Sequence, residues 1–206
     1  MTVVIFQLKM KEKTQKRAIK TRQRLIETSI RMVKESGYEA LRIEELVRST
    51  EVAKGTFFSH FKNKEDLMNL LISLKIHSIL DQLTLIQPPQ TVNQMIRNLM
   101  PLLSFMSSEH YVFDVIFRCC GASSETEIGP IASSLIRLEK IVSKWILEGD
   151  YRKDITPQIA AEGIEAFLMQ SLALNFCAEN SYLALEQRFS IYLKAWLTPT
   201  KDSQGQ

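Results

Sequence analysis

The sequence predicts an all-α protein of about nine helices. Apolar residues recur at intervals of three and four along most of the chain, which is the spacing of one face of an α-helix. No segment shows the alternation of apolar and polar residues that is typical of a half-buried strand. Only 7 Gly and 6 Pro are distributed over 206 residues, so few positions are expected to interrupt the helices.

The N-terminal third is predicted to contain three helices. The first covers residues 14–36, and Gly37 is expected to end it because glycine readily adopts the left-handed conformation that follows many helices. The second and third cover residues 43–49 and 53–61, and the short turn between them, residues 50–52, makes the pair a helix-turn-helix. The apolar face of the first helix is formed by Leu25, Ile26, Ser29, Ile30 and Val33.

The third helix has two distinct sides. Phe57 and Phe61 are four residues apart and therefore lie on the same face. This pair is expected to pack into a small three-helix core, and the opposite side is expected to be exposed. The expected core partners are Leu46, Val52 and Ile30, and the expected exposed residues are Lys54, Thr56, Phe58 and Ser59.

A fourth helix is predicted over residues 64–85, with Asn63 as its N-cap, and Pro88 and Pro89 stop it. Five more helices are predicted at about 91–107, 109–120, 127–148, 157–179 and 181–197. The expected domains are a flexible basic extension at 1–13, a helix-turn-helix domain at 14–66, a second helical domain at 67–198 and a flexible tail at 199–206.

Composition excludes several classes of protein. No apolar run reaches the roughly 18 residues of a membrane span, and the apolar start lacks the basic stretch and cleavage site of a secretory signal. A soluble cytoplasmic protein without membrane association is therefore expected. Residues 1–9 are interpreted as an upstream extension, since Met10 is a second candidate initiator.

Three cysteines, Cys119, Cys120 and Cys177, form no C-x-x-C pair. Their odd number argues against a disulfide framework and a structural zinc site. We interpret them as reduced core thiols, and a sensing role for the adjacent Cys119 and Cys120 is left open. No metal and no cofactor is expected.

Positive charge is concentrated in the N-terminal part. Residues 1–66 hold 15 Lys and Arg against 9 Asp and Glu, whereas residues 67–206 hold 11 against 14. Within residues 9–24 only Glu12 is acidic, and such a block can neutralise phosphates and release counterions. A merely solvated helix face is the alternative. The basic residues of the block are Lys9, Lys11, Lys13, Lys16, Arg17, Lys20, Arg22 and Arg24.

Residues 43–67 read IEELVRSTEVAKGTFFSHFKNKEDL. This run resembles the V-x-K-G-T-L-Y-x-H-F-x-N-K-E-x-L pattern of the TetR/AcrR family of transcriptional regulators, and the resemblance extends over about residues 20–70. It implies a repressor that binds double-stranded DNA as a homodimer and is released by a small-molecule effector held in the second domain.

The DNA contacts are expected at the start of the third helix, where free backbone N–H groups and the helix dipole attract phosphate. The resemblance implies that Thr56 and Phe58 approach base edges and sugar-phosphate, that His60 touches the backbone and that Lys64 binds a phosphate. The full expected set is Lys54, Gly55, Thr56, Phe58, Ser59, His60, Lys64, Arg42 and Lys62. The other histidines, His77 and His110, are read as structural or exposed.

The run departs from the family pattern at four positions. Glu51 stands where the family commonly has glycine, and a left-handed backbone there would cost on the order of 1 kcal/mol. Ala53 replaces a hydroxyl residue that would cap the helix. Val47 replaces a small residue, and Phe58 replaces a tyrosine and its hydroxyl.

In the second domain, apolar and sulfur-containing side chains predict an adaptable pocket for a largely apolar effector, although for any single one of them a place in the core is the favoured reading. The expected pocket residues are Met100, Phe105, Phe113, Phe117, Trp145, Phe167 and Met169. Stripes on the last two helices suit a four-helix dimer interface. Its expected residues are Ile164, Phe167, Ser171, Leu174, Phe189, Leu193 and Trp196.

The sequence leaves two other classes of function open. A protein of the same fold could act mainly through protein partners and bind DNA non-specifically, and the altered positions Glu51, Ala53 and Phe58 motivate this alternative. An enzyme is the weakest alternative, because no catalytic triad, paired carboxylates or glycine-rich phosphate loop occurs at usable spacing.

Overall fold

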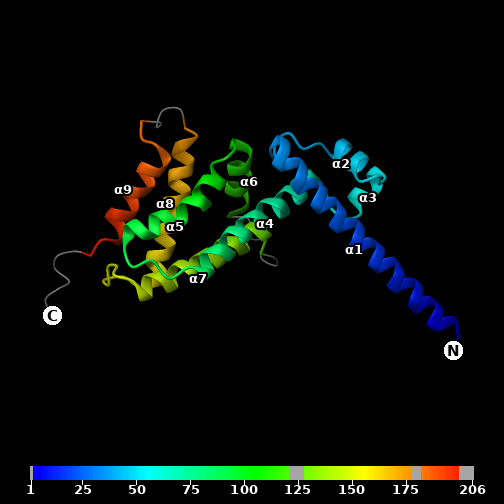
Figure 1. Cartoon of the computed structure of the whole chain (residues 1–206), viewed down its shortest axis with the longest axis horizontal. Coiled ribbons are helices and arrows are strands. Elements are labelled where there is room, and N and C mark those ends of the chain that lie inside the picture. Colours follow the sequence, from blue (N-terminus) through cyan, green and yellow to red (C-terminus); the bar gives the residue numbers. More distant parts are fainter. Residues whose placement is uncertain (1, 121–127, 178–181, 200–206) are drawn as a thin grey trace. The chain divides into compact units, whose positions relative to one another are not determined.

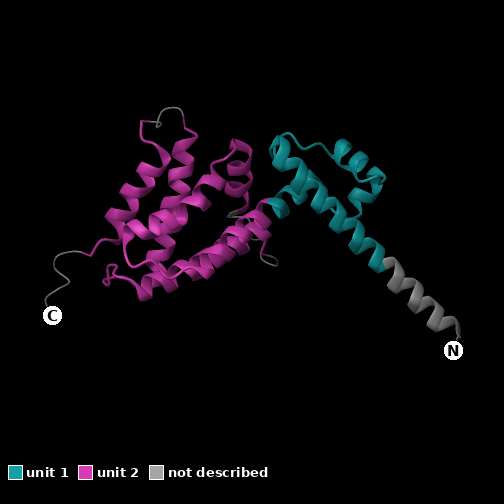
Figure 2. Cartoon of the chain, in the orientation of Figure 1, with its two compact units in different colours: residues 1–71 teal, residues 72–206 magenta. Residues whose placement is uncertain are grey.

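The computed structural model describes the backbone of residues 2–120, 128–177 and 182–199, and the side chains of these residues except 2–14 and 120. Within these ranges all regular secondary structure is helical, as predicted. The chain divides into two compact units, residues 1–71 and 72–206 (Figure 2). The division falls after residue 71, inside the fourth helix, five residues beyond the boundary at residue 66 that the sequence suggested.

The N-terminal unit consists of α1 (Thr2–Ser36), α2 (Ile43–Ser49), α3 (Lys54–Phe58) and the first turns of α4 (Lys64–Leu85) (Figure 1). Helix α2 has its predicted bounds. The predicted start of the first helix at residue 14 was wrong. Residues 1–13 contain no Gly or Pro that would stop a helix.

The core of this unit joins α1 to the helix-turn-helix. Leu25, Leu46 and Phe57 are fully buried, and Phe61 is nearly so. The expected contribution of Ile30 was wrong, because 46% of its side chain is exposed. The buried side of α1 runs instead through its neighbour Ser29, whose hydroxyl donates a hydrogen bond to the Leu25 carbonyl (2.8 Å).

Two residues of this unit adopt the left-handed backbone conformation. Gly37 has φ 85° and ends α1, and its N–H bonds to the Val33 carbonyl (2.9 Å), which confirms its predicted role. Glu51 has φ 52° in the turn between α2 and α3. A side chain in this conformation is strained because its Cβ approaches the following carbonyl oxygen. The strain predicted for a non-glycine residue at this position is therefore present.

The second unit contains the rest of α4 followed by five helices (Figure 1). Helix α8 packs between α7 and α9, α5 contacts α6, α8 and α9, and α6 contacts α7. A capping box of Thr91 and Gln94 begins α5, and the Thr156 hydroxyl accepts the Ile159 N–H at the start of α8. The five helices are α5 (Val92–Met106), α6 (His110–Cys120), α7 (Pro130–Glu148), α8 (Pro157–Asn175) and α9 (Leu185–Leu197).

A buried tyrosine ties two loops of this unit together. Tyr151 follows α7, is 1% exposed, and donates from its hydroxyl to the carbonyl of Pro89 (2.6 Å), which precedes α5. Burial raises the pKa of Tyr151 far above its ordinary value, so the hydroxyl keeps its proton. Gly149 lies directly beneath the ring, where a Cβ would come within 2.8 Å of the Pro89 oxygen.

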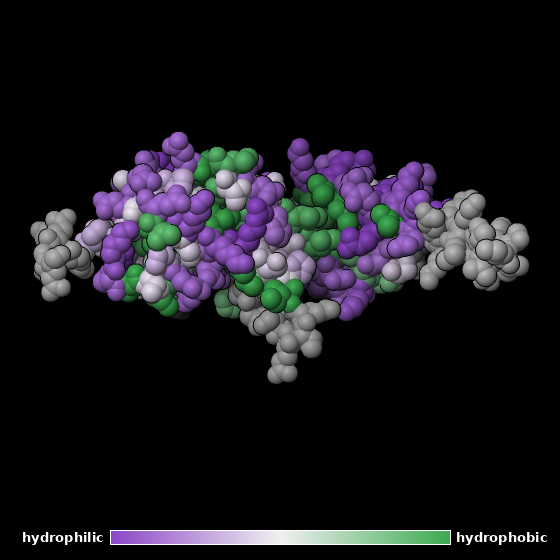
Figure 3. All heavy atoms as spheres, turned by 90° about the horizontal axis from the view of Figure 1, so that it is seen from below, coloured by the Kyte–Doolittle hydropathy of each residue, from purple (hydrophilic) through white to green (hydrophobic). Residues whose placement is uncertain are grey.

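Hydrophilic side chains cover much of the face shown in Figure 3, with hydrophobic groups scattered among them. No helix in the described part of the chain is long and apolar enough to cross a membrane. The described residues likewise contain no group of three or more His, Cys, Asp or Glu side chains placed to hold a metal ion.

Replacing Glu51 by glycine should relieve the strained turn. The substitution E51G is expected to stabilise the N-terminal unit by about 0.5–1 kcal/mol, because glycine reaches φ 52° without a steric cost. Hydrogen exchange of the backbone amides in α2 and the following turn measures this local stability. The matched control E51A keeps a Cβ in place and should give no gain. Equal protection in E51G and E51A would contradict the strain.

Replacing Tyr151 by phenylalanine should loosen the second unit. The substitution Y151F leaves the buried Pro89 carbonyl without its 2.6 Å donor, which costs about 1–3 kcal/mol. The midpoint of thermal unfolding should fall by about 2–4 °C for each kcal/mol. The control Y182F removes the hydroxyl of a ring that is 77% exposed, and its midpoint should not change. Equal midpoints for Y151F and Y182F would show that the hydrogen bond from Tyr151 to Pro89 does not stabilise the second unit.

Candidate nucleic-acid interface

The turn between α2 and α3 is held by backbone and side-chain hydrogen bonds. The Thr50 hydroxyl donates to the Leu46 carbonyl (2.7 Å), and the Val52 N–H donates to the Val47 carbonyl (3.0 Å). The buried face of α3 is held by aromatic packing, since the ring of Phe57 contacts that of Phe61 at 5.4 Å between centroids. The guanidinium of Arg22 covers the Phe61 ring at 5.0 Å. The orientation of α3 therefore follows from its buried face.

The opposite face of α3 is open to solvent, as predicted. Lys54, Gly55, Phe58 and Ser59 are exposed, and Thr56 is half-buried. A Cβ added at Gly55 would meet no atom within 4 Å, so packing within the chain does not require glycine there. The face is thus free to approach a large partner closely at Gly55.

The start of α3 lacks the side-chain cap that a hydroxyl residue would provide. Ala53 makes no side-chain cap hydrogen bond, as expected from its alanine side chain. The start of α4 is different, because Asn63 accepts the Asp66 N–H (2.8 Å) and so acts as the predicted N-cap. The Thr56 N–H donates to the Ala53 carbonyl (2.9 Å), and the Ala53 side chain accepts from none of the first N–H groups of α3.

Lys54, at the first position of α3, forms an ion pair across the turn. Its Nζ lies 2.6 Å from Oε1 of Glu44 in α2, and both side chains are more than half exposed. The hydrogen bond and the charge of Lys54 hold the pKa of the Glu44 carboxyl below its ordinary value. Lys54 is therefore held by a carboxylate in the free protein.

Two more of the predicted residues meet at one backbone carbonyl. Nη1 of Arg42 and Nζ of Lys64 donate to the Glu39 carbonyl, at 2.8 and 3.2 Å. Burial, followed by the neighbouring charge of Arg42, lowers the pKa of Lys64. The fold thus brings together two cations that are separated in sequence. Lys62 is exposed and His60 is half-buried nearby along the chain.

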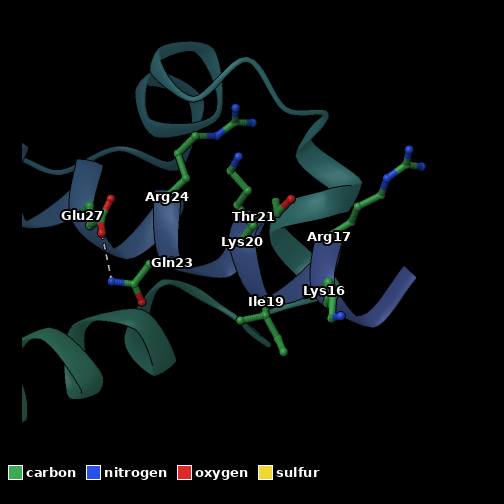
Figure 4. A pocket seen from close by; sticks show the side chains of 8 residues that line it. All are labelled: Lys16, Arg17, Ile19, Lys20, Thr21, Gln23, Arg24 and Glu27. Atoms are coloured by element: carbon green, nitrogen blue, oxygen red, sulfur yellow. Dashed lines mark hydrogen bonds between the residues drawn. The ribbon is translucent and has the colours of Figure 1, made fainter. Parts of the chain in front are cut away.

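Helix α1 adds a stripe of positive charge to the same unit. Arg17, Lys20 and Arg24 lie three and four residues apart, are exposed, and point to one side of the helix (Figure 4). Ile19 and Gln23 point to the other side, where Gln23 donates to Glu27 (3.0 Å). Lys16 and Arg22 of this block are exposed as well, and the basic residues predicted at positions 9–13 lie outside the described side chains.

The residues predicted to line an effector pocket fall into separate groups. Phe113 stacks on Phe176 and contacts Phe117, whose side chain is 56% exposed. Phe167 instead contacts Tyr192 and Trp196 on α9. Among the others, Trp145 is buried in α7, and Met100 and Phe105 are half-buried on α5.

Met169 lines a small hollow on α8 together with two glutamates and Ala166. One of them, Glu165, has its pKa raised by burial and by the nearby carboxylates of Glu139 and Glu162. These acidic surroundings do not resemble an apolar pocket. The described ring contacts join Phe113 to Phe117 and Phe167 to Tyr192, and a shared lining of the predicted effector residues stays a prediction.

Most of the predicted dimer stripe faces the inside of its own unit, which is a correction. Ile164, Ser171, Phe189 and Leu193 are at most 1% exposed within a single chain, so they cannot contact a second copy in this conformation. The stripes on α8 and α9 pack against each other and against neighbouring helices of the same chain. Leu174 is half-buried.

Phe167 and Trp196 join α8 to α9. The Trp196 Nε1 donates to the Ala160 carbonyl (3.0 Å), and its ring fills the space beside Gly163. The outward faces of these helices present other apolar side chains, such as Ile159 and Ile191, which are 47% and 48% exposed.

Two of the three cysteines and both remaining histidines lie among the described side chains. Cys119 and Cys177 are of intermediate burial, and the side chain of Cys120 lies outside the described residues. His77 contacts Nη1 of Arg137 (3.2 Å), and His110 lies 3.4 Å from Asp114 on its own helix. Both histidines therefore have local structural partners, as expected.

Sequence reasoning missed Glu44 as part of this surface. The residue stands in the first turn of α2, ten positions before Lys54. No local spacing rule links two residues that far apart, because their proximity depends on the angle between α2 and α3. The carbonyl of Glu39 was missed for the same reason. The sequence showed only that Glu44 stands at the start of a short helix, where the helix dipole favours a negative charge.

Known proteins match this part of the chain and its fold. The family described as "Bacterial regulatory proteins, tetR family" matches residues 25–71. The HTH-type transcriptional regulator YerO of Bacillus subtilis (strain 168) is 40% identical over 47 residues, which are 23% of this chain and 16% of YerO. The aligned region thus spans less than a fifth of that relative.

Solved structures extend the similarity to the whole fold. FadR of Thermus thermophilus, a TetR-family repressor in complex with lauroyl-CoA, has TM-score 0.61 at 15% identity and aligns with 85% of this chain and 92% of FadR. RolR in complex with resorcinol has TM-score 0.63 at 19% identity, with 88% and 90% covered. At these identities the similarity establishes the arrangement of helices.

The helix-turn-helix with its buried aromatic pair and exposed α3 face coincides with the segment that the family pattern matches. The arrangement of helices over most of the chain is similar to that of the structures named above. Residues 25–71 therefore match the tetR family of bacterial regulatory proteins, and the fold is similar to that of a TetR-family repressor.

Proposed function

We propose that the protein is a transcription regulator that binds an operator as a homodimer through α3 and acts as a repressor released by a small, largely apolar effector. The observation that carries the proposal is the exposed face of α3, which is anchored by Phe57 and Phe61 and flanked by cations. A short helix presented in this way can lay its first turn in the major groove.

The chemistry of this face fits a duplex. Thr56 and Ser59 can exchange hydrogen bonds with phosphate or base edges, and the Ser59 hydroxyl, which donates to the Thr56 carbonyl (2.7 Å), still has lone pairs to accept. Phe58 is 46% exposed and offers an apolar contact to a thymine methyl group. Close approach at Gly55 would bring backbone N–H groups near a phosphate.

Electrostatics supports the same partner. Positive charge comes from two parts of the N-terminal unit. One is the α1 stripe of Arg17, Lys20 and Arg24, and the other is the pair of cations at the Glu39 carbonyl, Arg42 and Lys64. Phosphate neutralisation by such side chains releases counterions and supplies much of the affinity for DNA. These residues would position the protein on the duplex, and the α3 face would read its sequence.

An effector site in the second unit is proposed from the relatives. FadR and RolR are solved with lauroyl-CoA and resorcinol, respectively. The core of the second unit here consists of buried apolar side chains of α5 to α9. Helix α4 runs without interruption from the first unit into the second. An effector that moves α4 would thereby change the presentation of α3.

A gel shift with the DNA that flanks the protein's own gene tests the proposal. We expect binding that is much tighter than to a scrambled duplex of equal length at physiological salt. T56A and K64A should each weaken binding to the flanking DNA. Equal affinity for both duplexes would sink the proposal. A partner protein captured equally well by the wild type, T56A and K64A would instead favour action through protein contacts.

The salt dependence of binding should reveal the phosphate contacts. For a dimer that neutralises six to ten phosphates, the slope of log affinity against log salt concentration should lie at roughly −5 to −9. A slope near zero would be incompatible with phosphate neutralisation and hence with this binding mode.

Replacing Arg17, Lys20 and Arg24 together by glutamine should weaken DNA binding and flatten the salt slope by about 0.9 for each phosphate that is no longer neutralised. Fluorescence anisotropy with a labelled duplex at several salt concentrations measures both effects. A control that replaces the exposed Lys75, Arg97 and Lys140 of the second unit removes the same charge. An equal decrease in affinity for both triple variants would show a general charge effect and no contact by α1.

A further inference from the structure

The Glu44 to Lys54 ion pair lies on the surface that we propose to bind DNA. Lys54 is the first residue of α3, and its ammonium group is 2.6 Å from a carboxylate of α2. A phosphate can reach this ammonium only if the carboxylate gives it up or shares it. Glu44 itself would then face a negatively charged duplex.

We propose that Glu44 competes with DNA phosphate for Lys54 of the same chain. This competition weakens the non-specific binding of phosphate by α3. The inference rests on the proposed DNA-binding function and names a residue that regulates it. Its effect is to reduce the part of the affinity that does not depend on sequence.

The exposure of the pair makes the exchange feasible. The side chains of Lys54 and Glu44 are 56% and 67% exposed, and exposed ion pairs are weak enough to be replaced by a better acceptor. The lowered pKa of Glu44 shows that its carboxylate stays ionised at neutral pH and keeps its competing charge. A phosphate must therefore displace a charged competitor.

The chain contains a matched control for this charge. Glu45 is the next residue, lies in the same first turn of α2 and is exposed. Within the described part of the chain, it has no basic side chain at ion-pair distance. If the effect of Glu44 comes from its pairing with Lys54, then removal of the Glu45 charge should have a smaller effect.

The experiment is a double-mutant cycle on binding to a scrambled duplex, measured by anisotropy over a salt series. E44Q should bind about two- to fivefold more tightly for each protomer engaged, since the pair is exposed, and its salt slope should steepen by about 0.9 per freed lysine. E45Q should change binding much less. In the K54A background, E44Q should give little further gain, because the competitor has lost its target.

Several results would overturn the inference. An equal gain from E44Q with and without Lys54 would mean that Glu44 merely repels DNA, and an equal gain from E45Q would mean the same. A change confined to one base position of a specific duplex would mean that Glu44 reads a base, such as the cytosine amino group.

A measurement without DNA separates this inference from the proposed function. The pKa of the Glu44 carboxyl, followed by NMR, should lie lower in the wild type than in K54A. Equal values would show that the pair does not form in solution and would overturn the inference alone. A wild-type chain that binds no duplex at all, with the pair intact by NMR, would overturn the proposed function and with it the regulatory role of the pair.

Discussion

The burial of Phe57 and Phe61 is the interaction on which the rest of the DNA-binding surface depends. Helix α3 has only 5 residues, and an isolated helix of that length is unstable because its nucleation cost is not recovered. The two rings lie in the core with Leu25 and Leu46, so tertiary packing holds the helix and sets its direction. With one face fixed inside, the opposite face with Gly55 must point outward.

The turn before α3 shows how the fold tolerates an unsuitable residue. Glu51 occupies a left-handed conformation at φ 52°, although most side chains avoid it. The surrounding hydrogen bonds of Thr50 and Val52 and the buried side chains of Leu46 and Phe57 on either side impose the geometry. A strain on the order of 1 kcal/mol is small beside the burial of two phenylalanines. The motif therefore keeps its shape without its usual glycine.

The basic side chains of the N-terminal unit differ in the partners that hold them. Arg42 and Lys64 share the Glu39 carbonyl, whereas Lys54 is paired with Glu44. A phosphate that binds Lys54 must therefore exchange with a carboxylate. Neighbouring cations of one surface thus have different partners in the free protein.

The sequence by itself determined the features that depend on neighbours along the chain. Helical periodicity predicted an all-α fold and the bounds of α2, and residue preferences at helix ends predicted the roles of Gly37 and Asn63. The spacing of Phe57 and Phe61 predicted both faces of α3, and the departures at Glu51 and Ala53 were visible as local backbone problems. These features follow from interactions within about one helical turn.

Only the tertiary structure decided which element each helix face meets. The stripe through Ile164, Phe189 and Leu193 is apolar whether it faces another copy or its own chain, and the fold buries it internally. Ile30 lies outside the core for the same reason, since periodicity identifies an apolar face without naming its partner. The pairing of Lys54 with Glu44 depends on the angle between two helices, which no spacing along the chain encodes.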